Sequence, residues 1–191
     1  MRIIAGEFRG RKLDAPKGDG TRPTIDRVRE SLMSALVSLR GGLDGAVVLD
    51  AFAGSGALGL EALSRGADVA VFCERDRDAA AVVERNIATL RLARDRARLM
   101  RTDVLKRGAV APGRPFDLVF FDPPYATDPA EVFGLIARLC DAGALAGDVI
   151  VSYEHDAADD DAVADRAAAA GFGIASHRRF GDTSLDLLER F

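Results

Sequence analysis

The sequence predicts a doubly wound α/β fold built on a seven-stranded, mostly parallel sheet, with a C-terminal hairpin that supplies one antiparallel strand. From about residue 45 onward, short apolar runs alternate with longer segments of helical periodicity, which is typical of parallel strands covered by helices on both faces. Residues 177–191 instead read as two strands joined by a Gly-Asp turn. Hydrophobic residues make up 48% of the 191 residues and charged residues 29%, as in a folded globular protein.

The expected strands are apolar runs bounded by polar or glycine-containing segments. Five of them precede the hairpin, at residues 46–50, 67–74, 96–100, 116–122 and 148–153. The helices between them are expected in the segment up to residue 65 and over residues 76–90, 129–140 and 157–170. The hairpin adds two strands and completes the sheet.

The first 40 residues differ in character from the rest of the chain. Residues 2–5 and 11–16 look like two short strands that flank a glycine-containing turn. Apolar residues at positions 25, 28, 32, 36 and 39 have helical spacing, and Pro23 and Thr24 suit the start of that helix. We therefore expect a basic hairpin-and-helix extension at residues 1–40 ahead of a main domain at residues 41–191.

Composition excludes several classes of protein. No apolar run reaches the roughly 18 residues of a membrane span, and the first twelve residues lack the apolar segment of a signal peptide, so we expect a cytoplasmic protein without membrane contacts. Cys73 and Cys140 lack metal-ligand spacing, and the chain has only two histidines, so no metal site is expected.

The formal net charge of −4 conceals an uneven distribution of charge. Basic residues concentrate in residues 1–12 and 84–114, whereas acidic residues concentrate in residues 154–166. This segregation leaves room for a basic surface on an acidic protein.

The first motif is a glycine-rich turn between an apolar strand and a helix. Gly54 and Gly56 follow the strand that ends at Asp50, and such a turn lets a ligand approach the backbone and the helix N-terminus. Glu74 ends the next strand, where a carboxylate can accept hydrogen bonds from ribose hydroxyls. Together with Gly59, these glycines also satisfy the dinucleotide fingerprint, so an NAD(P)-binding oxidoreductase is an alternative. Asp50 argues against it, because its charge suits a cationic ligand end.

The second motif is Asp122-Pro123-Pro124-Tyr125, directly after the strand at residues 116–122. Consecutive prolines remove two backbone donors and stiffen the turn at the carboxyl end of a strand, where α/β sheets bind ligands. The Asp122 carboxylate and the Pro123 carbonyl can accept the two hydrogens of an exocyclic amino group on a base. Tyr125 can stack on that base, a contact worth about 1–3 kcal/mol.

These motifs resemble those of S-adenosylmethionine-dependent amino-methyltransferases with a class I Rossmann-like fold. The segments RIIAGEFRGRKL, TRPTIDRVRESL and FGDTSL resemble the bacterial 16S ribosomal RNA guanine-N2 methyltransferase D family, and the likeness runs from Met1 to the final hairpin. Two departures are visible: Met33 stands where an aromatic residue is expected, and Asp122 replaces the asparagine common in related N-methyltransferases.

The resemblance implies roles for individual residues. The cofactor would be S-adenosylmethionine, with Glu74 on its ribose, Asp103 and the Val104 backbone on its adenine amino group, and Arg22 and Thr24 near its carboxylate. Its methionine part would lie against Asp50, Phe52, Gly54, Ser55 and Gly56. The catalytic residues would be Asp122, Pro123, Pro124 and Tyr125. The RNA would contact Arg9, Arg11, Lys12, Arg27 and Arg29, with residues 1–40 acting as RNA grip and cofactor lid.

The implied reaction is methylation of the N2 amino group of a guanine in 16S ribosomal RNA, of the guanine-966 type, with S-adenosylhomocysteine as the second product. The substrate would be the small ribosomal subunit or a late precursor, with bound ribosomal proteins as partners of a monomeric enzyme. A DNA adenine-N6 methyltransferase or a protein-glutamine methyltransferase would share the proline-rich motif. A non-catalytic RNA-binding scaffold is a further alternative, which predicts no methyl transfer.

Overall fold

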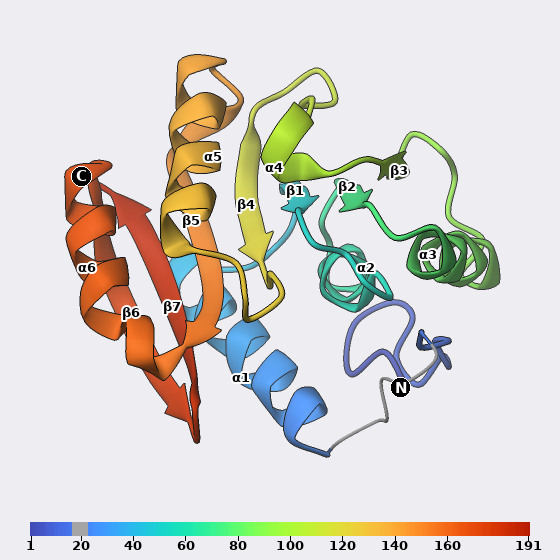
Figure 1. The fold of residues 1–191 in the computed structure, drawn as a ribbon. Coiled ribbons are helices and arrows are strands. Elements are labelled where there is room, and N and C mark those ends of the chain that lie inside the picture. The colour runs from blue at the N-terminus through green and yellow to red at the C-terminus, as the bar shows by residue number, and fades with distance from the viewer. Residues whose placement is uncertain (17–22) are drawn as a thin grey trace.

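The computed structural model has one seven-stranded sheet with helices on both faces (Figure 1). It describes residues 1–16 and 23–191, with the backbone alone at residues 23–26. The helices are α1 (Pro23–Arg40), α2 (Ala57–Ser64), α3 (Arg77–Thr89), α4 (Val104–Arg107), α5 (Pro129–Asp141), the 3₁₀ turn η1 (Ala157–Asp159) and α6 (Asp160–Ala169). The strands are β1 (Val47–Asp50), β2 (Val69–Glu74), β3 (Ala97–Arg101), β4 (Phe116–Phe121), β5 (Leu145–Asp156), β6 (Phe172–Phe180) and β7 (Thr183–Arg190).

The sheet order is β3-β2-β1-β4-β5-β7-β6, and β7 is antiparallel to both of its neighbours. The other neighbouring pairs are parallel, so the predicted fold class with one antiparallel strand near the end of the chain is confirmed. Apolar side chains from α1, α2 and α3 pack on one face of the sheet. Those from α4, α5 and α6 pack on the other.

Two strands are longer than their apolar runs indicate. β5 begins at Leu145 and not at residue 148, because its first residues pair with β4 before a register shift at Phe116/Leu118. β6 begins at Phe172, since it pairs with β7 along its whole length. The sequence pattern also gave no sign of α4, whose four residues are too few to show a period.

The N-terminal segment packs against the sheet domain instead of forming a core of its own. Its two arms meet at a single antiparallel bridge, Arg2–Lys12, in place of the two strands expected. Leu32 and Met33 of α1 are fully buried in the same cluster as Val48 and Phe72 of the sheet. The sequence pattern changes near residue 40, but the residues before and after this point share one hydrophobic core.

The buried carboxylate of Glu61 on α2 ties the N-terminal segment to the main domain. It accepts hydrogen bonds from Ile4 N at 2.8 Å and Ala5 N at 3.0 Å, and it pairs with Arg65 Nε at 2.8 Å. A buried charge is tolerated when its oxygens are satisfied in this way. Within the described residues, no helix is long and apolar enough to cross a membrane.

Replacing Glu61 by alanine is expected to destabilise the fold by about 3–5 kcal/mol, because two backbone donors and a guanidinium lose their partner. Urea unfolding followed by circular dichroism measures the change. The matched control is Glu84→Ala, which removes an exposed pair with Arg101 and should cost under about 1 kcal/mol. Equal stability of the two variants would show that Glu61 does not hold the N-terminal segment in place.

Candidate active site

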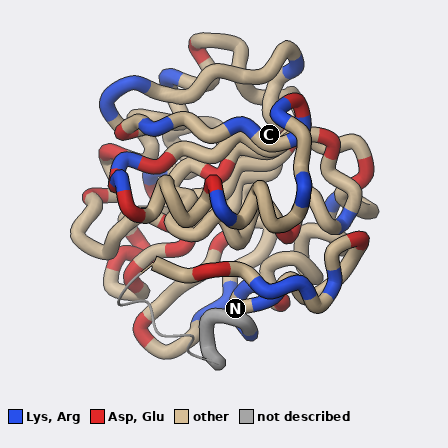
Figure 2. Tube along the Cα trace, turned by 90° about the vertical axis from the view of Figure 1, so that its right-hand side faces the viewer, with Lys and Arg blue, Asp and Glu red and all other residues tan. Residues whose placement is uncertain are grey.

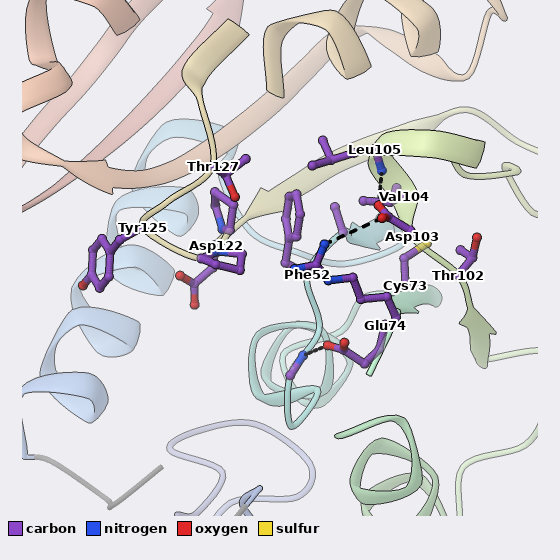
Figure 3. Close-up of a pocket in the computed structure, with 15 residues that line it drawn as sticks. Phe52, Cys73, Glu74, Thr102, Asp103, Val104, Leu105, Asp122, Tyr125 and Thr127 are labelled. Atoms are coloured by element: carbon purple, nitrogen blue, oxygen red, sulfur yellow. Dashed lines mark hydrogen bonds and ion pairs between the residues drawn. The ribbon is translucent and has the colours of Figure 1, made fainter. Parts of the chain in front are cut away.

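A cavity of about 400 Å³ opens at the carboxyl edge of the parallel strands (Figure 3). Its walls come from the segments that follow β1, β2, β3 and β4, since the carboxyl ends of parallel strands meet at one edge of a sheet. The lining residues are Ala51, Phe52, Gly54, Cys73, Glu74, Arg75, Thr102, Asp103, Val104, Leu105, Asp122, Pro123, Pro124, Tyr125 and Thr127.

The glycine-rich turn closes one side of this cavity. Gly54 and Gly56 have φ angles of 54° and 79°, in the left-handed region that favours glycine. Gly59 serves packing instead, because a Cβ there would lie 2.4 Å from the Phe72 ring of β2. Two of the glycines thus shape the backbone of the turn, and the third lets α2 approach the sheet.

Glu74 links the ends of β1 and β2. Its Oε2 accepts a hydrogen bond from Gly54 N at 2.8 Å (Figure 3). Its Oε1 accepts one from Asp76 N at 2.8 Å. Each carboxylate oxygen can accept a further bond. Glu74 therefore fixes the glycine-rich turn and still presents acceptors to a ligand.

Asp50 lies beneath the turn and does not line the cavity. Its side chain is buried, with the residue 2% exposed, and Oδ2 accepts a hydrogen bond from Gly59 N at 3.0 Å. Burial raises the pKa of Asp50 to about 7, against the lowering effect of the Gly59 hydrogen bond and with smaller contributions from the charges of Asp122 and Glu74. Of the residues expected to contact the methionine part of a cofactor, Ser55 and Gly56 also lie outside the lining, whereas Phe52 and Gly54 are part of it.

The far side of the cavity is formed by the start of α4. Asp103 caps this helix by accepting a hydrogen bond from Leu105 N at 3.1 Å, and it lies 3.7 Å from Arg75 Nη1. Val104 contributes its backbone and an apolar side chain to the same wall. Thr102 Oγ1 is buried and has no hydrogen-bond partner among the described residues, so this wall contains an unsatisfied polar group.

The proline-rich loop after β4 forms the opposite side. Asp122 is exposed and lies, with Tyr125, across Phe52 from Asp103 and Val104 (Figure 3). The Pro124 carbonyl accepts a hydrogen bond from Thr127 N at 2.8 Å, which tightens the loop. The ring of Tyr125 is at the rim, with the residue 67% exposed.

Sequence reasoning missed one acidic residue beside this loop. Phe121 ends β4 and pairs with Tyr153 of β5, so Asp122, which follows β4, and Glu154 of β5 are neighbours. Burial raises the pKa of Glu154 to about 8, and the charge of Asp122 adds to the effect. The signal was available, since Glu154 follows an apolar run as Glu74 and Asp122 do.

The basic residues expected to contact RNA divide into two groups. Arg9, Arg11 and Lys12 are exposed on the N-terminal segment, and Arg27 is exposed on α1. Arg29 corrects our expectation: it is only 4% exposed, and its Nη2 donates to Arg2 O at 2.6 Å.

Two further expectations concern residues with little or no structural description. Arg22 lies outside the described residues, and Thr24 is described by its backbone in α1 alone. Among the side chains that the structure describes, no three His, Cys, Asp or Glu residues are grouped to hold a metal ion.

The chain is similar to proteins with a described activity. It is 42% identical over 156 residues to the ribosomal RNA small subunit methyltransferase D of Escherichia coli K12, covering 82% of this chain and 75% of that protein. The protein of the same name from Haemophilus influenzae is 39% identical over 159 residues, covering 82% and 79%. A solved structure, a putative methyltransferase yhhF from Escherichia coli, matches with a TM-score of 0.79 and 35% identity, covering 100% and 97%.

A family model described as conserved hypothetical protein 95 matches residues 1–189, nearly the whole chain. The match includes both sides of the cavity and the N-terminal segment. It agrees with the resemblance that the two motifs and the terminal segments indicate. The chain therefore belongs to the family of ribosomal RNA small subunit methyltransferase D.

Proposed function

We propose that this protein is an S-adenosylmethionine-dependent methyltransferase that modifies the N2 amino group of a guanine in small-subunit ribosomal RNA. One observation carries the proposal: the Asp122–Tyr125 loop and the Gly54–Glu74 pair line the same cavity. A site for a methyl donor and a site for an amino group thus face each other across a single space. The choice of ribosomal RNA as the substrate rests on the names of the relatives.

The cavity suits the proposed cofactor. Its volume falls within the range of roughly 300–1,000 Å³ typical of ligand sites. Glu74 offers acceptors to a ribose diol, while Asp103 and the Val104 backbone face the place of an adenine amino group. The hydroxyl of Thr102, which has no partner among the described residues, gives that end a further polar contact. Phe52 and Leu105 provide apolar surface between the two ends.

Acidic residues dominate the electrostatics of the site. The charges of Asp122 and Glu74 both raise the pKa of Asp50, so the three carboxyl groups lie close enough to interact. Such a cluster favours a ligand with a positive charge. When bound, S-adenosylmethionine supplies a methyl group on a sulfonium and leaves as S-adenosylhomocysteine.

Asp122 and Pro123 act on the target amino group. The carboxylate accepts one N2 hydrogen and the Pro123 carbonyl accepts the other, so the nitrogen lone pair is directed towards the cavity. As the nitrogen gains positive charge, the Asp122 carboxylate stabilises it, and the stiff proline turn holds both acceptors in place beforehand. The methylated nitrogen then releases one proton to solvent, which leaves a neutral N2-methylguanine. The base must leave its stack to reach this loop, and flipping a base out of its stack costs roughly a few kcal/mol.

The N-terminal segment offers the positive charge that RNA binding needs. Arg9, Arg11 and Lys12 are exposed there, and Figure 2 shows basic residues gathered around the N-terminus. Phosphate contacts of this kind position an RNA without reading its sequence. A structured particle, the small subunit or a late precursor, fits a protein with this little surface for base recognition.

The proposal is tested by methyl transfer from labelled S-adenosylmethionine to four separate substrates: small ribosomal subunits, free 16S ribosomal RNA, DNA and a protein extract. We expect label in RNA, and mass spectrometry of the digested RNA should place it on N2 of one guanine. Label in DNA adenine or in protein glutamine would overturn the substrate assignment. NADH binding without S-adenosylhomocysteine binding would overturn the reaction class.

Asp122→Ala is expected to lower turnover by about 10²–10³-fold, because the amino group loses a charged acceptor. The affinity for S-adenosylhomocysteine, measured by calorimetry, should stay within about threefold, since Asp122 acts on the base. Asp95→Ala, an exposed change in the loop before β3, is the matched control and should behave as wild type. Loss of turnover and of cofactor affinity together would show that Asp122 supports the fold or the cofactor instead.

Cofactor affinity is expected to depend on pH. Because burial raises the pKa of Asp50 to about 7 and that of Glu154 to about 8, both carboxyls become ionised as the pH rises from 6 to 9. The added negative charge attracts a sulfonium, so the affinity for S-adenosylmethionine should rise several-fold. A shift of one pK unit in a carboxyl on binding corresponds to a change of about tenfold in affinity. The affinity for S-adenosylhomocysteine, whose sulfur is uncharged, should rise less.

Calorimetry with both ligands at pH 6 and pH 9 measures this difference. Asp50→Asn removes one of the two titrating charges and should flatten the ratio of the two affinities. A ratio that stays constant with pH in the wild type would show that these carboxyls do not act on the sulfonium.

A further inference from the structure

The β6–β7 hairpin ends at the same edge of the sheet as the cavity. Thr183, the first residue of β7, pairs with Asp156, the last residue of β5, and the turn residues 181–182 lie just beyond. Figure 1 shows this hairpin tip on one side of the loop that follows β4 and the N-terminal segment on the other. The tip therefore borders the approach to the proposed base site.

A direct contact joins the hairpin tip to the proline-rich loop. The hydroxyl of Tyr125 lies 3.0 Å from Oγ1 of Thr183, within hydrogen-bond distance. Because Tyr125 stands at the rim of the cavity, a base held at Asp122 would bring its ribose and phosphates close to this hairpin. The contact places the hairpin tip on the side of the cavity formed by the proline-rich loop, where the base is proposed to bind, whereas the exposed Arg75 and Lys106 pair with Asp103 on the opposite side.

The tip carries two exposed arginines that are held in place. Arg178 Nη1 donates to the hydroxyl of Ser31 on α1, and Arg179 Nε donates to Gly181 O at 3.0 Å. A guanidinium has five N–H donors, so each side chain keeps donors for a phosphate. Fixed guanidinium groups lose less conformational entropy when they bind.

A third arginine lies close by on α1. Arg27 is exposed and precedes Ser31, the partner of Arg178, by four residues, so it occupies the same helix face one turn earlier. The exposed acids nearest in sequence are Asp182 at the tip and Glu30 on α1. Asp26 precedes Arg27 in sequence and Asp156 pairs with Thr183 at the tip, so the three arginines are the basic part of a surface of mixed charge.

We propose that Arg27, Arg178 and Arg179 form a second phosphate-binding surface for the RNA, across the target base from Arg9, Arg11 and Lys12. This inference rests on the proposed function, because it takes the substrate to be RNA with its target base at Asp122. The backbone of an RNA leaves a flipped nucleotide in two directions. Two basic surfaces on opposite sides of the cavity would hold both.

The double variant Arg178→Ala/Arg179→Ala tests the surface. Binding to purified small ribosomal subunits should weaken by about tenfold, and the plot of log affinity against log salt should lose about 2 units of slope, one for each phosphate contact. S-adenosylhomocysteine affinity and the unfolding temperature should match the wild type, since both arginines are exposed. Arg179→Glu, which keeps the bond between Arg178 and Ser31, should bind more weakly than Arg179→Ala.

The matched control is Arg94→Ala/Arg98→Ala, which removes the same charge at the amino end of β3, on the sheet edge away from the cavity. It should retain wild-type affinity and salt dependence. Equal binding by the two double variants would overturn the inference alone and leave methyl transfer by the wild type intact. Wild-type protein that neither binds nor methylates small-subunit RNA would overturn the proposed function and this surface with it.

Discussion

The buried parallel strands β1, β2 and β4 are the constraint on which the rest of the site depends. Their apolar side chains fill both faces of the sheet, so polar residues can appear only where each strand ends. The ends of these strands share one edge, and Glu74 joins two of them through Gly54 N. The proline-rich loop begins where β4 ends and cannot move away from that edge without unpairing the strand. Strand packing therefore sets the distance between the side of the cavity proposed for the cofactor, at Gly54 and Glu74, and the side proposed for the base, at Asp122.

The same packing forces acidic groups into proximity, and this proximity has an electrostatic cost. Asp50 is held in a dry environment where its ionised form is disfavoured, and Glu154 is held next to Asp122. A fold selected for stability alone would neutralise or separate these charges. Their retention fits a site that binds a cation, since a positive ligand relieves the repulsion between them. The repulsion among these carboxyl groups and the preference for a positively charged ligand therefore have the same structural cause.

Sequence patterns predicted the features that depend on local chemistry. Strand ends, the glycine turn and the proline turn follow from periodicity and backbone preference, and the structure places Gly54, Glu74 and Asp122 around one cavity. Features that depend on distant contacts were not predictable in this way. Arg29 looked like a surface residue, but its guanidinium reaches Arg2 O, a contact 27 residues away. Similarly, nothing in the local sequence of Tyr125 indicates Thr183, 58 residues later, as its partner.

The acidity of the cavity also determines where RNA can be held. Phosphates are repelled by the Asp122 carboxylate, so the backbone of a bound RNA must pass at a distance from it while its base enters. At physiological salt, charges are screened over roughly 8 Å, which is enough for basic residues on the rim to act independently of acids in the interior. The charges around the cavity are therefore arranged in two parts: acidic residues in its interior that attract a cation, and basic residues at its rim that attract an anion. A net charge of −4 is compatible with RNA binding for this reason.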